Sequence, residues 1–118
     1  MTKKPWDLRE RSMAFAVAVI RFCRTLPRTP ESQDIARQLR RAASSVAANY
    51  RAARRGKSHR DFAAKVGTVI EEADESLFWL ELLARANIAT ADETSELLAE
   101  ANELVAIFTS CQKTARAK

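Results

Sequence analysis

In this chain, the charged residues are the ones whose types and spacing could support chemistry. Residues 37–60 hold eight basic side chains and no acidic one. Residues 61–100 reverse this balance, with ten Asp or Glu against Lys65 and Arg85. An arginine fork matches two oxygens of a phosphate or carboxylate at once. The net charge of +5 therefore combines a basic segment that favours an anionic partner with an acidic segment that competes for it.

The arginines of the basic segment share one side of a helix. At about 100° per residue, six of them fall within an arc of roughly 140°, opposite Leu39 and Val46. The six are Arg37, Arg40, Arg41, Arg51, Arg54 and Arg55. Two interpretations follow. The arc is either a solvated face whose arginines pair with carboxylates of the next helix or of another subunit, or a surface that binds the phosphates of RNA or DNA.

Metal and nucleophile chemistry have little support in the sequence. Four carboxylates within residues 71–75 suggest a di-iron helix bundle, but such sites also need Glu-x-x-His motifs. The single histidine, His59, has no carboxylate three residues before it. Cys23 and Cys111 have no paired histidine and fit apolar helical patterns, so a thiol nucleophile is not expected. The sequence predicts no metal site, no cofactor and no enzyme.

The periodicity predicts four helices, over about residues 8–26, 30–55, 59–86 and 91–114. Four capping residues precede them, namely Asp7, Thr29, Ser58 and Thr90. We expect Gly56 to end the second helix in a left-handed conformation and Asn87 to end the third. Four amphipathic helices with short loops predict an all-α, up-down-up-down four-helix bundle that forms a single domain over residues 1–118.

No segment has the features of a membrane span or a signal peptide, so we expect a cytoplasmic protein with no membrane partner. A helix-turn-helix DNA reader is disfavoured because these helices are too long.

Several apolar side chains lie off the core stripes. Met13, Val17 and Ile20 lie roughly opposite the core side of the first helix, and Phe78 and Leu82 interrupt the acidic side of the third. Clustered exposed apolar residues reduce solubility unless another surface covers them. We therefore expect these five residues to form contacts between subunits of a homo-oligomer.

The second and third helices resemble a known family. The resemblance rests on QLRRAASSVAAN (residues 38–49), Ser58-x-x-Asp61-Phe62 and EEADE (residues 71–75). These segments are similar to the four-helix-bundle family that is also called the S23 ribosomal, or 23S rRNA intervening-sequence, protein family. The similarity spans about residues 7–116. One difference is that Ala52 and Ala53 replace a Glu-Gly pair usual at this point, which makes the helix more basic.

The resemblance implies a bacterial bundle that assembles into a ring-like homopentamer. Some family members are encoded by inserts within 23S rRNA genes. A related protein, the accessory variability determinant of diversity-generating retroelements, is a basic pentamer that binds a reverse transcriptase and nucleic acid. The sequence thus favours a non-enzymatic oligomer that binds nucleic acid or an acidic protein through the six arginines. The alternative is a purely structural oligomer whose arginines form salt bridges between helices or subunits.

Overall fold

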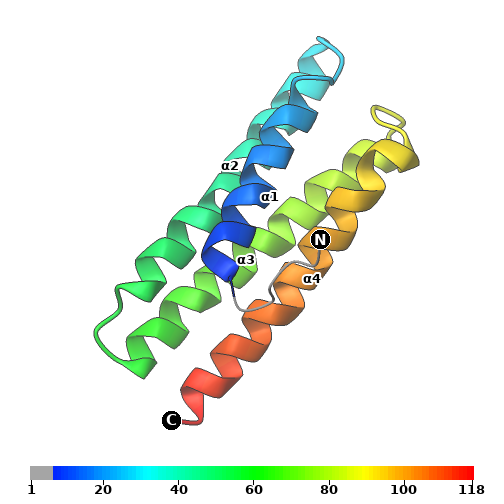
Figure 1. The fold of residues 1–118 in the computed structure, drawn as a ribbon. Helices are drawn as coiled ribbons and strands as arrows, with labels where there is room; N and C mark the ends of the chain where they lie inside the picture. The colour runs from blue at the N-terminus through cyan, green and yellow to red at the C-terminus, as the bar shows by residue number, and fades with distance from the viewer. Residues whose placement is uncertain (1–6) are drawn as a thin grey trace.

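The protein folds into four long helices joined by short turns (Figure 1). The structure is a computed structural model that describes residues 7–118. The helices are α1 (Leu8–Cys23), α2 (Pro30–Arg54), α3 (His59–Arg85) and α4 (Ala91–Arg116). Each helix runs antiparallel to the next along the chain. The predicted all-α, up-down-up-down four-helix bundle is confirmed, although α1 ends before the predicted Leu26 and α4 continues beyond the predicted residue 114.

Capping side chains fix where the helices begin. The Ser58 hydroxyl accepts a hydrogen bond from the Asp61 backbone N–H at 3.0 Å. Thr90 and Glu93 form a reciprocal capping box, with distances of 2.7 Å and 3.1 Å. Such bonds satisfy N–H groups that the first turn of a helix leaves without partners. The residue at which each helix begins could therefore be predicted from the sequence.

Of the two predictions for how helices end, one is confirmed and the other is wrong. Asn87 adopts a left-handed conformation with φ of 60°, and the Ile88 N–H donates to the Leu83 carbonyl at 3.0 Å. This is the hydrogen-bond pattern of a left-handed helix end, as predicted. The prediction for Gly56 was wrong, because its φ is not positive. Gly56 is needed for space instead, since an added Cβ would lie 2.9 Å from the Ala53 carbonyl oxygen and from Asp61 Oδ2.

The core combines large side chains with small ones. Leu39, Leu80 and Phe108 are fully buried, and the Phe108 ring lies 5.2 Å from that of Tyr50. The buried side of α2 also carries fully buried alanines, namely Ala36, Ala42 and Ala43. Small side chains allow neighbouring helices to approach closely, so the apolar side of α2 packs tightly into the core. The arginines of α2 lie away from the core.

The helix pairs of the bundle do not pack equally closely. Each helix packs along the next one in sequence, whereas α1 and α4 contact each other least. The cross-section is accordingly oblong, with Cα extents of 31 Å and 19 Å beside a length of 47 Å. Arg11 joins the two helices through Glu100, with both nitrogen–oxygen distances at 2.8 Å. Its pKa is raised above the ordinary arginine value, chiefly by the hydrogen bond to Glu100.

Within residues 7–118, every helix is too short or too polar to cross a lipid bilayer.

Candidate nucleic-acid interface

The six arginines predicted to form one binding surface divide into three groups. Arg41 turns toward α3, where its guanidinium pairs with Glu75 and lies 3.5 Å from Glu72 Oε1. Glu75 also accepts a hydrogen bond from Trp79 Nε1 at 3.0 Å. The Glu72 oxygen is buried and has an ion-pair contact with Arg41 but no hydrogen bond among the described residues. Arg41 is therefore largely neutralised within its own subunit.

Arg40 and Arg54 turn the other way, toward α1. Arg40 lines a recess beside Cys23 and is half-buried. Burial raises the pKa of the Cys23 thiol, and the Arg40 guanidinium opposes this shift. Arg54 lines a hollow with Arg9, Met13 and two acidic residues, Asp7 and Glu10. Burial likewise raises the pKa of the Tyr50 hydroxyl, against the opposing effect of the Arg54 charge. Arg40 therefore extends the basic surface toward α1, whereas the charge beside Arg54 is mixed.

Arg37, Arg51 and Arg55 face away from the bundle, and all three are exposed. Arg37 bonds to Asp34 on its own helix at 3.1 Å, but both side chains are about two-thirds exposed. Exposed pairs of this kind contribute little and separate easily. Neither Arg51 nor Arg55 has an ion pair within residues 7–118. This outward group is the part of the predicted surface that is accessible to a partner.

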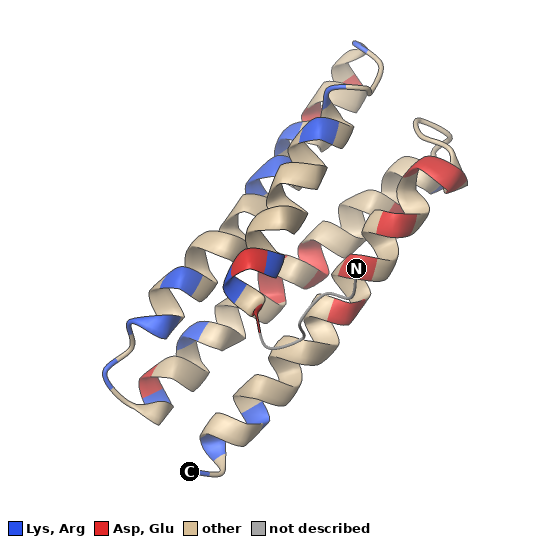
Figure 2. Ribbon diagram, viewed as in Figure 1, with Lys and Arg blue, Asp and Glu red and all other residues tan. Residues whose placement is uncertain are grey.

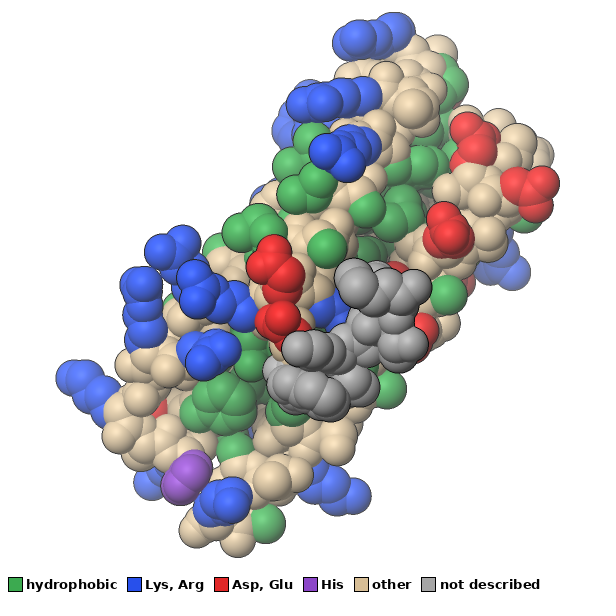
Figure 3. Space-filling model, in the orientation of Figure 1, with side chains coloured by type: hydrophobic (Ala, Val, Ile, Leu, Met, Phe, Trp, Pro, Cys, Tyr) green, Lys and Arg blue, Asp and Glu red, His purple; other side chains and the backbone are tan. Residues whose placement is uncertain are grey.

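The basic surface includes residues that the single-helix analysis missed. Arg21, Arg24 and Arg28 lie at the end of α1 and in the turn that follows, and all are exposed. Lys and Arg accordingly follow the α1–α2 hairpin, while the acidic residues gather on α3 and α4 (Figure 2). The space-filling view shows blue side chains along much of the α1–α2 hairpin and red ones on α4, although red side chains also lie near the start of α1 and blue ones near the C-terminus (Figure 3). A helical wheel of α2 could not reveal it, because it arises from the packing of α1 beside α2.

The apolar residues predicted to contact other subunits form two exposed patches. On α1, Met13 is 50% exposed and Val17 is 37% exposed, with half-buried Ile20 beside them. On α3, Phe78 is 54% exposed and stacks edge-on against Trp79, with a centroid distance of 4.9 Å; Leu82 is half-buried. Because α1 and α3 do not pack against each other, they occupy diagonal corners of the bundle. The two patches therefore lie apart on the surface, on helices that do not contact each other.

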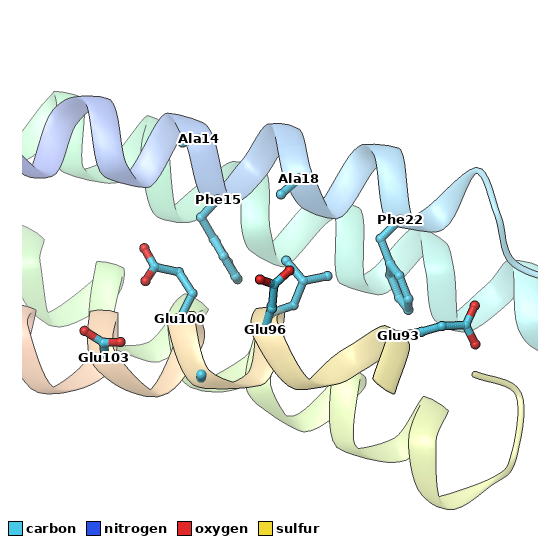
Figure 4. Close-up of a pocket in the computed structure, with 10 residues that line it drawn as sticks. Ala14, Phe15, Ala18, Phe22, Glu93, Glu96, Glu100 and Glu103 are labelled. Atoms are coloured by element: carbon cyan, nitrogen blue, oxygen red, sulfur yellow. The ribbon is translucent and has the colours of Figure 1, made fainter. Parts of the chain in front are cut away.

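The loose α1–α4 seam contains a groove of about 490 Å³ with an apolar floor and an acidic rim. Phe15 and Phe22 point from α1 toward α4, along which four glutamates are spaced (Figure 4). The four are Glu93, Glu96, Glu100 and Glu103. Nowhere in residues 7–118 do three or more His, Cys, Asp or Glu side chains form a group that could hold a metal ion. The groove has an acidic rim, of which Glu100 and Glu103 are paired with Arg11, and none of the six α2 arginines lines it.

These features define a four-helix bundle in which basic residues are concentrated on α1 and α2, acidic residues on α3 and α4, and exposed apolar patches on α1 and α3. Residues 4–110 match the family model for the 23S rRNA-intervening sequence protein, and the chain belongs to this family. It is also similar to the crystal structure of a protein with unknown function from the S23 ribosomal protein family of Bacteroides thetaiotaomicron VPI-5482. The two chains are 27% identical and superpose with a TM-score of 0.80, covering 86% of this chain and 94% of the other. No curated protein matches this chain.

Proposed function

We propose that this protein is a non-enzymatic, homo-oligomeric helical bundle that binds nucleic acid through the basic surface of its α1–α2 hairpin. The observation that supports this proposal is the direction in which the arginines point. Among the described residues, only Arg41 of the six α2 arginines pairs with a carboxylate of the neighbouring helix. The outward group of Arg37, Arg51 and Arg55 remains available to phosphates, and the adjoining arginines of α1 enlarge the same surface.

The arrangement of the apolar patches supports assembly into a ring. A two-fold dimer buries the same patch on both partners, which would leave the other patch exposed. If the α1 patch of one subunit covers the α3 patch of the next, both patches are buried in every subunit. Such head-to-tail contacts produce closed rings when the rotation between subunits allows it. We propose five subunits, as the resemblance to pentameric family members implies, and a cytoplasmic location, which the two free cysteines favour.

A purely structural oligomer is the competing function, and the acidic side of the molecule favours it. Glu71 and Asp74 on α3 and Glu96 on α4 are exposed and have no ion pair among residues 7–118. In a ring, these carboxylates could meet the arginines of the next subunit. The arginines would then hold the assembly together and would not be available to nucleic acid.

One triple variant separates the two functions. Replacing Arg37, Arg51 and Arg55 with Gln removes the outward group and spares Arg41, which stabilises the subunit itself. Binding of a labelled single-stranded oligonucleotide is measured by fluorescence anisotropy over a range of salt concentrations, and subunit number by light scattering. A matched control is Arg85→Gln, which removes one exposed arginine from the opposite helix pair.

If the proposal is correct, the wild-type protein binds with an affinity that falls steeply with salt. Each lost phosphate contact lowers the slope of log affinity against log salt by about 0.7 for a single strand, so the triple variant should lose about 2 units of slope. Its subunit number should not change, and Arg85→Gln should behave as wild type. The competing function predicts the opposite result, namely weak binding by the wild type and a triple variant that dissociates into smaller species.

A further inference from the structure

A recess lies where the end of α1, the following turn and the start of α2 meet. We call it the α1–α2 recess. It has a volume of about 320 Å³ and is lined by Ile20, Cys23, Arg24, Arg28, Gln33 and Arg40. Two contacts fix the wall of the recess in place. Gln33 Nε2 donates a hydrogen bond to the Pro27 carbonyl oxygen at 2.9 Å, and Leu26 is buried in the core. The turn that carries Arg28 is therefore fixed to the bundle by contacts at both ends.

The α1–α2 recess has an unbalanced positive charge. Three of its six lining residues are arginines, and none is acidic. The nearest acids along the chain, Glu31 and Asp34, lie on a different side of α2, where Asp34 bonds to Arg37. Three arginines thus line one small space, and no carboxylate residue is among the residues that line it.

Of the three arginines that line the recess, Arg40 is the one whose charge a bound anion would stabilise most. It is half-buried, it lies beside the buried Cys23 thiol, and no carboxylate within residues 7–118 forms an ion pair with it. A charge that is partly removed from water loses solvation, and a bound counter-charge compensates for that loss. The thiol cannot supply this charge, because Cys23 is 4% exposed and donates to the Ala36 carbonyl, with a sulfur–oxygen distance of 3.8 Å.

We infer that the α1–α2 recess binds one phosphate group, and that the phosphorylated end of a nucleic-acid strand supplies it. A phosphate monoester carries a charge between about −1.5 and −2 at neutral pH and presents three acceptor oxygens, which suits a recess lined by three arginines. A backbone phosphodiester has one negative charge and a chain continuing on both sides. The recess lies at the end of the bundle, beside the arginines of α2, so a strand bound along α2 can place its terminal phosphate there. The source of the phosphate rests on the proposed function, whereas the recess itself does not.

The first experiment tests the recess with inorganic phosphate alone. Phosphate is titrated into ¹⁵N-labelled protein, and the side-chain Nε–H signals of the arginines are followed by NMR. We expect saturable shifts for Arg24, Arg28 and Arg40 in the millimolar range, and about ten-fold weaker binding in Arg40→Gln. Arg85→Gln removes the same charge from α3 and should leave the binding unchanged. The exposed Arg24→Gln is a second variant, which keeps the test valid if Arg40→Gln does not fold.

The recess inference is overturned if phosphate shifts no arginine signal, or if it shifts Arg51 and Arg55 as much as the three recess arginines. The second outcome would show general attraction of anions to a basic surface rather than binding at one place.

The second experiment identifies the source of the phosphate. Oligonucleotides of one sequence, with and without a 5′- or 3′-terminal phosphate, are compared by fluorescence anisotropy. For the wild type and for Arg85→Gln, we expect the phosphorylated strand to bind about ten-fold tighter than the unphosphorylated strand. For Arg40→Gln and Arg24→Gln, we expect the two strands to bind equally. Equal affinities of the two strands for the wild type would overturn the assignment to a strand end. If inorganic phosphate binds in the recess but neither strand binds, the proposed function fails and the recess inference stands.

Discussion

Replacing Phe78 with Ala is expected to weaken subunit assembly much more than it weakens the subunit. Phe78 lies on the outer side of α3 and is 54% exposed. A phenylalanine buries at least about 150 Å² in a full core, so roughly 80 Å² of Phe78 remains for a neighbouring subunit to cover. At about 25 cal/mol per Å², this area contributes roughly 2 kcal/mol to each subunit contact. The dissociation constant of the contact should therefore rise about 30-fold.

Within the subunit, the same substitution removes mainly the edge-on contact with Trp79, which has a ring-centroid distance of 4.9 Å. Aromatic pairs of this geometry contribute about 0.5–1.5 kcal/mol, so the helical fold should persist. Sedimentation velocity over a dilution series measures the assembly, and circular dichroism measures the fold. Asn102→Ala is a matched control, since it truncates an exposed side chain of α4 that lies outside both apolar patches.

The reasoning is refuted if the Phe78→Ala variant keeps the wild-type mass at every concentration. In that case the side chain remains exposed in the assembly, and the α3 patch does not contact another subunit. A wild-type protein that is monomeric over the whole dilution series would refute the ring itself.

Further predictions concern stability and metal content. Arg41→Gln should lower the free energy of unfolding by up to about 1 kcal/mol in urea, because its ion pairs are partly exposed, whereas Arg37→Gln should change it by less than about 0.5 kcal/mol. Gly56→Ala should lower the melting temperature, because a Cβ there would lie 2.9 Å from a backbone carbonyl oxygen; an unchanged melting temperature would contradict this packing. The hydrogen bond from Lys65, with that from the Lys57 backbone, holds the pKa of Asp61 below its ordinary 3.8. The stability from this charge is therefore present above pH 3.8 and is lost as the pH falls through the lower folded-state pKa, so Asp61→Asn should reduce the acid sensitivity measured by urea unfolding. Elemental analysis of protein purified without added metal should find less than one iron, manganese or zinc ion per subunit, since the described residues offer no ligand cluster.

The fold was predictable from the sequence because its signals are local. Capping residues such as Ser58 and Thr90 form hydrogen bonds within three residues of themselves, so their spacing alone indicates where a helix begins. The apolar periodicity then determines which side of each helix is buried. The predicted end of α2 at about residue 55 agrees with the structure, but the left-handed conformation predicted for Gly56 was wrong for a physical reason. Gly56 is required by the approach of Asp61 from the next helix, and this contact is not visible in the local pattern.

The candidate binding surface was only partly predictable. A helical wheel places six arginines in one arc, but it does not show what packs beside each edge of the arc. The structure pairs Arg41 with carboxylates of α3 and turns Arg40 toward α1. It also brings Arg24 and Arg28 beside Arg40 across the turn between the helices. Contacts of this kind depend on the packing angle and rotation of neighbouring helices, which the periodicity of a single helix does not determine.

The weak seam between α1 and α4 has a consequence for how the chain acquires its structure. Nearly all contacts between helices join sequence neighbours, and the one pairing that joins the first helix to the last is the sparsest. Chains dominated by such local contacts fold quickly, since little loop-closure entropy is lost before contacts form. We expect α2, α3 and α4 to associate in the folding transition state and α1 to dock afterwards. Substitutions in the buried side of α1, such as Val19→Ala, should then accelerate unfolding and leave the folding rate nearly unchanged, whereas Leu80→Ala should slow folding.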